Sequence, residues 1–144
     1  LPVLRITSGH NMEPGFQPGD IILLTKNDEV NKGEICAFYF NNKLLLRRVI
    51  AREGDTVEID EKGYVKVNKE FLEEDGYISE HALGQCDIDF PFRVPSGQLF
   101  VMGDNRDYAL DSRATNFGCI SQEEIFGKPL ARIYPFSNLT WYGF

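Results

Sequence analysis

Four short segments of the sequence concentrate the side chains that could do chemistry. They are Ser8-Gly9-His10-Asn11-Met12-Glu13-Pro14, Leu46-Arg47-Arg48-Val49-Ile50, Phe100-Val101-Met102-Gly103-Asp104-Asn105-Arg106 and Asp111-Ser112-Arg113. Arginines and aspartates are prominent among them, and His10 adds an imidazole that could act as an acid or a base near neutral pH. Turn-forming sequences accompany the first three segments, namely Gly19-Asp20, Gly54-Asp55 and Val94-Pro95-Ser96-Gly97. Each of the first three segments is therefore accompanied by a predicted turn.

The order and spacing of these segments resemble the signature boxes of type I signal peptidases and cover nearly the whole chain. A Gly-Asp dipeptide alone would carry no information, but Val101–Arg106 followed by Asp111-Ser112-Arg113 is highly specific. The resemblance implies a mainly β, antiparallel signal-peptidase architecture with a small inserted cap lobe. It also implies an ancestral endopeptidase that cut signal peptides after small residues at the outer face of a membrane.

The resemblance further implies a serine nucleophile and a neutral lysine base, at positions occupied here by Asn11 and Arg47. A lysine amine acts as a base near pH 7 only where burial lowers its pKa. A carboxamide is no nucleophile because its lone pair is delocalised, and a guanidinium, with a pKa of about 12 or more, stays protonated. Ala109 stands where many relatives carry a serine that holds the lysine amine. We predict a catalytically inactive chain.

Nine other motif residues are predicted to be structural around the cleft: Gly9, Met12, Arg48, Gly103, Asp104, Asn105, Asp111, Ser112 and Arg113. The resemblance implies two ion pairs, Arg48 with Asp104 and Arg113 with Asp111. The two glycines suit positions where the backbone turns sharply or approaches a peptide closely.

Three further side chains near the site are given structural interpretations. Asn11 is predicted to cap a turn. Arg47 is predicted to form an ion pair with a carboxylate. His10 is predicted to be an exposed turn residue, because no Ser or Cys occupies a motif position from which it could form a new dyad.

Short strands separated by Gly, Pro, Asn and Asp are predicted to position these residues. The β-forming runs are 20–25, 34–40, 44–52, 56–60, 64–67, 98–102 and 128–136. Glu61-Lys62-Gly63 joins the fourth and fifth runs in a predicted hairpin. A short helix is predicted over 121–126, with a capping box from Ser121 to Glu124 and Gly127 closing it.

The chain is predicted to divide into a core of residues 1–57 and 94–144 and an inserted hairpin and cap lobe of residues 58–93. The acidic stretch 69–93 is expected to be a loop or a small lobe. Apolar residues at both ends, Leu1–Leu4 and Trp141–Phe144, could be core or could form an exposed rim beside a bilayer.

Bulk composition excludes several classes of partner. The net charge of −7 and pI near 4.8 argue against a nucleic-acid partner. The longest basic cluster, Arg47-Arg48, is too short to bind anionic lipid by charge.

The three cysteines, Cys36, Cys86 and Cys119, are widely spaced, so no metal or cofactor is predicted. Both one disulfide and three core thiols remain open. No run of about 18 apolar residues occurs, and a transmembrane anchor ahead of residue 1 is expected from the resemblance.

The leading functional prediction is a non-cleaving accessory protein at the extracytoplasmic face of the cell membrane. It would bind a secreted-protein or pilin segment, alongside sortases, as dyad-lacking relatives do in Gram-positive pilus assembly. The alternative is an active signal peptidase whose catalytic residues were changed in the laboratory. A third class, the self-cleaving transcriptional repressors, would need a DNA-binding domain and is disfavoured by Gly103–Arg106.

Overall fold

Antiparallel strands make up most of the fold. The computed structural model describes residues 2–6 and 9–143. The strands are β1 (Val3–Arg5), β2 (Ile21–Thr25), β3 (Ile35–Phe40), β4 (Lys43–Arg52), β5 (Thr56–Ile59), β6 (Val65–Val67), β7 (Glu70–Phe71), β8 (Phe92–Arg93), β9 (Gln98–Met102), β10 (Ile120–Ser121), β11 (Ile125–Tyr134) and β12 (Thr140–Trp141). Two 3-10 turns, η1 (Gln122–Glu124) and η2 (Phe136–Asn138), flank β11.

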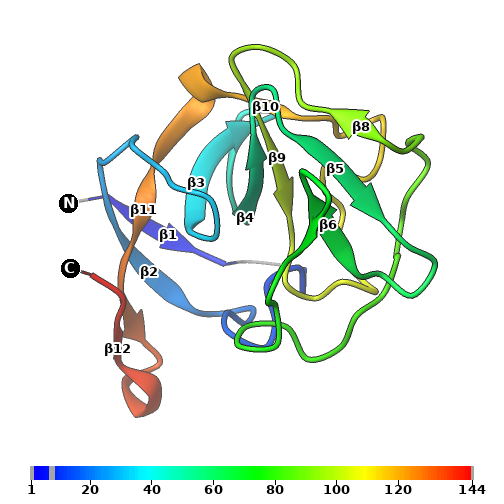
Figure 1. The fold of residues 1–144 in the computed structure, drawn as a ribbon. Helices are drawn as coiled ribbons and strands as arrows, with labels where there is room; N and C mark the ends of the chain where they lie inside the picture. The colour runs from blue at the N-terminus through cyan, green and yellow to red at the C-terminus, as the bar shows by residue number, and fades with distance from the viewer. Residues whose placement is uncertain (1, 7–8, 144) are drawn as a thin grey trace.

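The strands form two sheets that lie side by side (Figure 1). The larger sheet has the order β1-β2-β11-β3-β4-β9-β10, with β12 also paired to β11, and the smaller has the order β7-β6-β5-β8. The C-terminal β11 therefore lies between β2 and β3, which joins both ends of the chain in one sheet.

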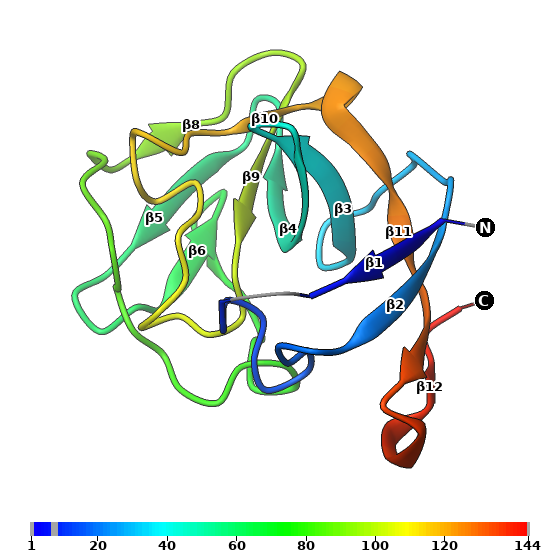
Figure 2. The ribbon, with the colours of Figure 1, turned by 180° about the vertical axis from the view of Figure 1, so that it is seen from behind.

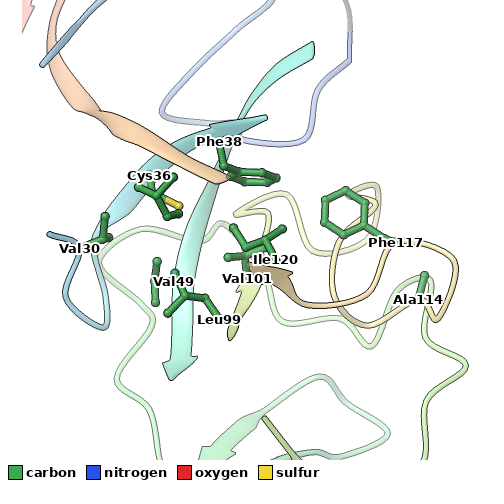
Figure 3. Close-up of a cluster of buried hydrophobic side chains, with 10 residues drawn as sticks. Val30, Cys36, Phe38, Val49, Leu99, Val101, Ala114, Phe117 and Ile120 are labelled. Atoms are coloured by element: carbon green, nitrogen blue, oxygen red, sulfur yellow. The ribbon is translucent and has the colours of Figure 1, made fainter. Parts of the chain in front are cut away.

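Three apolar clusters hold the sheets together. The first, around Phe38, Val49 and Val101, packs against Phe117 and Ile120 (Figure 3). The second cluster takes Ile50 and Phe100 from the larger sheet and Val57 and Val65 from the smaller sheet, so it joins the two. The third places Met12 of the first motif, and Phe16 just after that motif, against Ile22, Leu24, Ala37 and Leu46.

The predicted mainly β architecture is present, and each predicted β-forming run overlaps an observed strand. The hairpin is confirmed, because Val57, Glu58 and Ile59 pair with Val67, Lys66 and Val65. The alternation of apolar and polar residues predicted this hairpin correctly, because β5 and β6 bury every second side chain.

The helix predicted over 121–126 is wrong. Ser121 does cap a turn, its Oγ accepting a hydrogen bond from the Glu123 amide at 3.3 Å, but the turn is 3-10 and ends at Glu124. Ile125 then begins β11 and pairs with Phe38 of β3. Gly127 lies inside this strand, where a Cβ would collide with the Thr25 carbonyl. Close strand pairing, rather than helix termination, explains this glycine.

The smaller sheet runs from Thr56 to Arg93, so it begins two residues before the predicted lobe of residues 58–93 and ends at the same residue. Because its apolar side chains share a cluster with the larger sheet, the division of the chain into core and lobe stays a prediction. Within the described residues, no helix has the length and apolar character needed to cross a bilayer.

Candidate functional site

An open cleft of about 480 Å³ lies between β1, the first motif and the beginning of β4. Its lining residues are Leu4, Arg5, Ile6, Gly9, Asn11, Met12, Phe16, Lys43, Leu44, Leu45, Leu46 and Arg47. Asn11 and Arg47, at which the resemblance places the nucleophile and the base, therefore line the same cleft.

Two strand edges face this cleft. On one edge, β4 pairs with β3 from Lys43 to Arg48. On its other edge, β4 pairs with β9 over Arg48–Arg52, so in the described structure no strand pairs with this edge ahead of Arg48. β1 is the terminal strand of the larger sheet (Figure 2). Unpaired backbone donors and acceptors on such edges can bind another strand.

Asn11 and Arg47 both bind the backbone of Leu110. The Leu110 amide donates to the Asn11 side-chain oxygen at 3.1 Å, and Arg47 Nε donates to the Leu110 carbonyl at 3.0 Å. Arg47 also donates from Nη1 to the Leu46 carbonyl at 2.7 Å. Asn11 thus bridges to a loop distant in sequence instead of capping its own turn. Asn11 and Arg47 therefore clamp the first and second motifs to the backbone of Leu110, the residue directly before the fourth motif.

The ion pair predicted for Arg47 is wrong. No carboxylate of the described residues lies within 4.0 Å of its guanidinium, which is buried and packs 5.6 Å above the Phe117 ring. The nearby carboxylate of Asp111 is instead paired with Arg113. Burial lowers the pKa of Arg47 to about 10, against an opposing effect of Asp111, so at pH 7 the group remains protonated.

Ala109 is fully buried next to the clamp. A Cβ on Gly103 would lie 2.6 Å from the Asn11 carbonyl oxygen and would also strike the Ala109 methyl. Gly103 therefore allows two segments of the chain to approach closely, while an approach to a bound peptide stays a prediction. Gly9 has φ of +87°, which confirms the predicted sharp turn before Asn11.

Both predicted ion pairs are present. Arg48 contacts Asp104 through Nε–Oδ1 at 2.9 Å and Nη2–Oδ2 at 2.7 Å. Arg113 and Asp111 form a second bidentate pair, with both contacts at 2.9 Å and both side chains fully buried. Asp111 Oδ2 also accepts from the Gly103 amide at 2.8 Å, which ties the ion pair to the third motif.

Other predicted structural residues also form hydrogen bonds between different motifs. Ser112 Oγ accepts from the Val101 amide at 2.9 Å. Asn105 donates from its side chain to the His10 carbonyl at 2.9 Å, and its amide donates to the Asn11 carbonyl at 3.0 Å. Met12 lies in the third apolar cluster. Ser8 of the first motif is outside the described residues.

His10 is half exposed, as predicted for a turn residue. Its Nδ1 lies 2.6 Å from Glu13 Oε2, and its ring meets Tyr108 edge-on at 5.5 Å. The three cysteines are free thiols; Cys36 is in the core and the other two are half-buried.

Sequence reasoning missed the ion pair between Glu74 and Arg106. Arg106 Nη1 and Nη2 reach the two carboxylate oxygens of Glu74 at 3.0 and 2.6 Å, with both side chains fully buried. The Tyr77 hydroxyl donates to Glu74 at 2.8 Å, and the Tyr77 ring lies 3.8 Å from the Arg48 guanidinium. Arg106 is in the specific motif, but Glu74 lies in the acidic run Glu73-Glu74-Asp75, where no local pattern distinguishes it.

Comparison with known proteins assigns this arrangement to a family. The model for signal peptidase, peptidase S26, matches residues 3–134. The chain belongs to this family. The predicted family and fold class are thereby confirmed.

Several of the similar proteins are bacterial signal peptidases. The chain is 30% identical to signal peptidase I of Bacillus licheniformis, over 93% of this chain and 77% of that protein. It is 31% identical to signal peptidase IB of Staphylococcus aureus, over 92% and 78% of the two chains. Among solved structures, a signal peptidase I from Enterococcus faecalis aligns with a TM-score of 0.55 and 28% identity, covering 69% of this chain and 96% of that one.

Proposed function

We propose that this signal peptidase family protein binds extended peptide segments without cleaving them. The observation that carries the proposal is the clamp on Leu110, the pair of hydrogen bonds that Asn11 and Arg47 form with the backbone of that residue. These hydrogen bonds give both side chains a structural role in place of a catalytic one. The side chains at the two dyad positions are thereby engaged with the protein's own backbone.

The chemistry of the two side chains supports the absence of cleavage. Acyl transfer by a Ser/Lys dyad needs a nucleophilic hydroxyl and an amine that can accept its proton. Asn11 offers a carboxamide, and Arg47, with a pKa of about 10, holds its proton at neutral pH. Ala109 adds no hydroxyl that could orient a base.

The cleft supports retained peptide binding. An extended peptide placed between β1 and β4 could hydrogen bond to the open edges of both strands, while its side chains meet the apolar lining. This geometry requires no catalytic group.

The biological setting that we propose is assembly of pili at the outer face of the cell membrane, with a secreted-protein or pilin segment as the ligand and sortases nearby. An exposed apolar end of the molecule supports a membrane-proximal position. Phe136 is 78% exposed, and Leu139 and Trp141 are each 65% exposed. These residues lie on the segment that projects around η2 and β12 (Figure 1).

A cleavage assay with a synthetic signal-peptide substrate tests the proposal. We expect no product from the unaltered chain and detectable product from a variant combining Asn11→Ser, Arg47→Lys and Ala109→Ser. Lys62→Ala, on the exposed hairpin turn, is the control for handling and contamination. Cutting by the unaltered chain that Asn11→Ala or Arg47→Met abolishes would establish an active peptidase instead.

A further inference from the structure

The charge of the cleft is opposite to that of the protein. The chain has 22 Asp and Glu residues and 15 Lys and Arg residues. Among the described residues that line the cleft, however, the charged ones are Arg5, Lys43 and Arg47, and all three are basic. A concave surface lined by one sign of charge attracts ligands of the opposite sign.

Arg47 is the most deeply placed of these three cations. A guanidinium has five N–H groups, and in the described structure one on Nε and one on Nη1 donate to the backbone carbonyls of Leu110 and Leu46. Neutral carbonyls do not balance its charge, and no carboxylate of the described residues lies within 4.0 Å. Asp111 lies near enough to act on the charge of Arg47 but is paired directly with Arg113. A buried cation without a direct ion pair is costly, and a bound anion would offset that cost.

The remaining lining indicates what kind of anion fits. Leu4, Ile6, Leu44 and Phe16 present apolar surface beside the basic groups, and the edges of β1 and β4 offer backbone pairing. Inorganic phosphate would use neither feature, whereas an apolar peptide in extended conformation would use both.

We infer that the cleft selects extended apolar peptides that present a carboxylate to Arg47. This inference rests on the proposed peptide-binding function and adds the chemical class of ligand to it. The carboxylate can come from two sources, the C-terminal α-carboxylate of a peptide or the side chain of an Asp or Glu within it. A planar carboxylate suits a guanidinium, which can donate to both of its oxygens.

Three synthetic peptides distinguish the sources. They share one apolar sequence of Val and Ala, carry an N-terminal fluorophore, and end in a free carboxylate, in a carboxamide, or in a carboxamide with one internal Glu. Fluorescence anisotropy at low salt gives the Kd of each. We expect one of the carboxylate forms to bind about tenfold more tightly than the neutral peptide, as a charge-assisted hydrogen bond would give, and to weaken as salt is added.

Variants of the protein connect the difference to Arg47. We expect Arg47→Met to remove the preference for the carboxylate peptide, Arg47→Lys to keep most of it, and Lys62→Ala to leave it unchanged. Circular dichroism melts establish that each variant is folded, and the three-peptide comparison on the unaltered protein needs no variant.

The outcomes separate this inference from the function on which it rests. Equal binding of all three peptides would overturn the carboxylate preference while leaving peptide binding intact. Binding of none of them would overturn peptide binding by this cleft, and the preference with it. A preference that survives Arg47→Met in a folded variant would also contradict the inference, because it would assign recognition to other cations.

Discussion

At the scale of single residues, the site shows how a carboxamide and a guanidinium from two different motifs can hold one backbone position. Asn11 accepts a hydrogen bond from the N–H of Leu110, and Arg47 donates one to the C=O of the same residue. The resemblance correctly predicted the pairing of Arg48 with Asp104, because that pair belongs to the specific motif. It could not predict the partner of Arg47, because Asp111, the obvious carboxylate, is held in a bidentate contact by Arg113.

The clamp makes a prediction about stability. Asn11→Ala leaves the partly buried Leu110 amide without its acceptor, so we expect the free energy of unfolding to fall by about 1 kcal/mol. Urea denaturation followed by Trp141 fluorescence measures the change, and Asn116→Ala, at an exposed position, is the matched control. Equal stability of the two variants would mean that the Asn11 contact contributes nothing to folding.

At the scale of elements, long strands were predictable and short ones were not. β3 and β4 contain continuous β-forming residues, so local pattern identifies them. β7, β8, β10 and β12 have two residues each, and what makes them strands is a partner distant in sequence. The same reason explains the failed helix, because β3 pairs with Ile125 and extends the chain where local capping signals indicated a helix.

Contacts with residues distant in sequence also hold the loop from Leu72 to Pro91. No local sequence pattern in this loop predicted them. Glu74 lies in that loop and forms its fully buried ion pair with Arg106 of the third motif. Arg113 Nη1 donates to the carbonyl of Leu83 in the same loop at 2.7 Å. The acidic stretch is therefore held against the framework of the site by two motif arginines.

Removing Glu74 should disrupt this attachment. Glu74→Ala leaves Arg106 as an uncompensated buried cation, so we expect a loss of about 3–5 kcal/mol in the free energy of unfolding. The neighbouring Glu73→Ala, at an exposed position, should change stability by less than about 0.5 kcal/mol. Thermal and urea unfolding of both variants measure the difference, and similar small losses for the two would mean that the pair is not needed to hold the loop.

At the scale of the whole molecule, the cleft and the exposed apolar end are connected through the strands of the larger sheet. β1 forms one side of the cleft, and β2 joins it to β11, on which β12 is paired. A surface that held η2 and β12 against a bilayer would therefore also fix the orientation of the cleft relative to that bilayer. Such an arrangement would present the cleft to segments emerging from the membrane.

Trp141, the single tryptophan of the chain, reports directly on this arrangement. Because Trp141 is 65% exposed, its emission should shift to shorter wavelength when zwitterionic phosphatidylcholine vesicles are added, as the indole enters the interface. Phe136→Ser with Leu139→Ser should lower the partition coefficient about tenfold or more, because two apolar side chains are lost from the contact.

Phe71→Ser is the matched control for that experiment, because Phe71 is 59% exposed but lies in β7 of the smaller sheet. Its partition should equal that of the unaltered protein. Equal losses from Phe71→Ser and from the double variant would indicate that vesicle binding depends on general surface hydrophobicity. An unchanged Trp141 spectrum would remove the membrane-facing role of the C-terminal segment, while binding of peptides in the cleft would be unaffected, since the two surfaces use different residues.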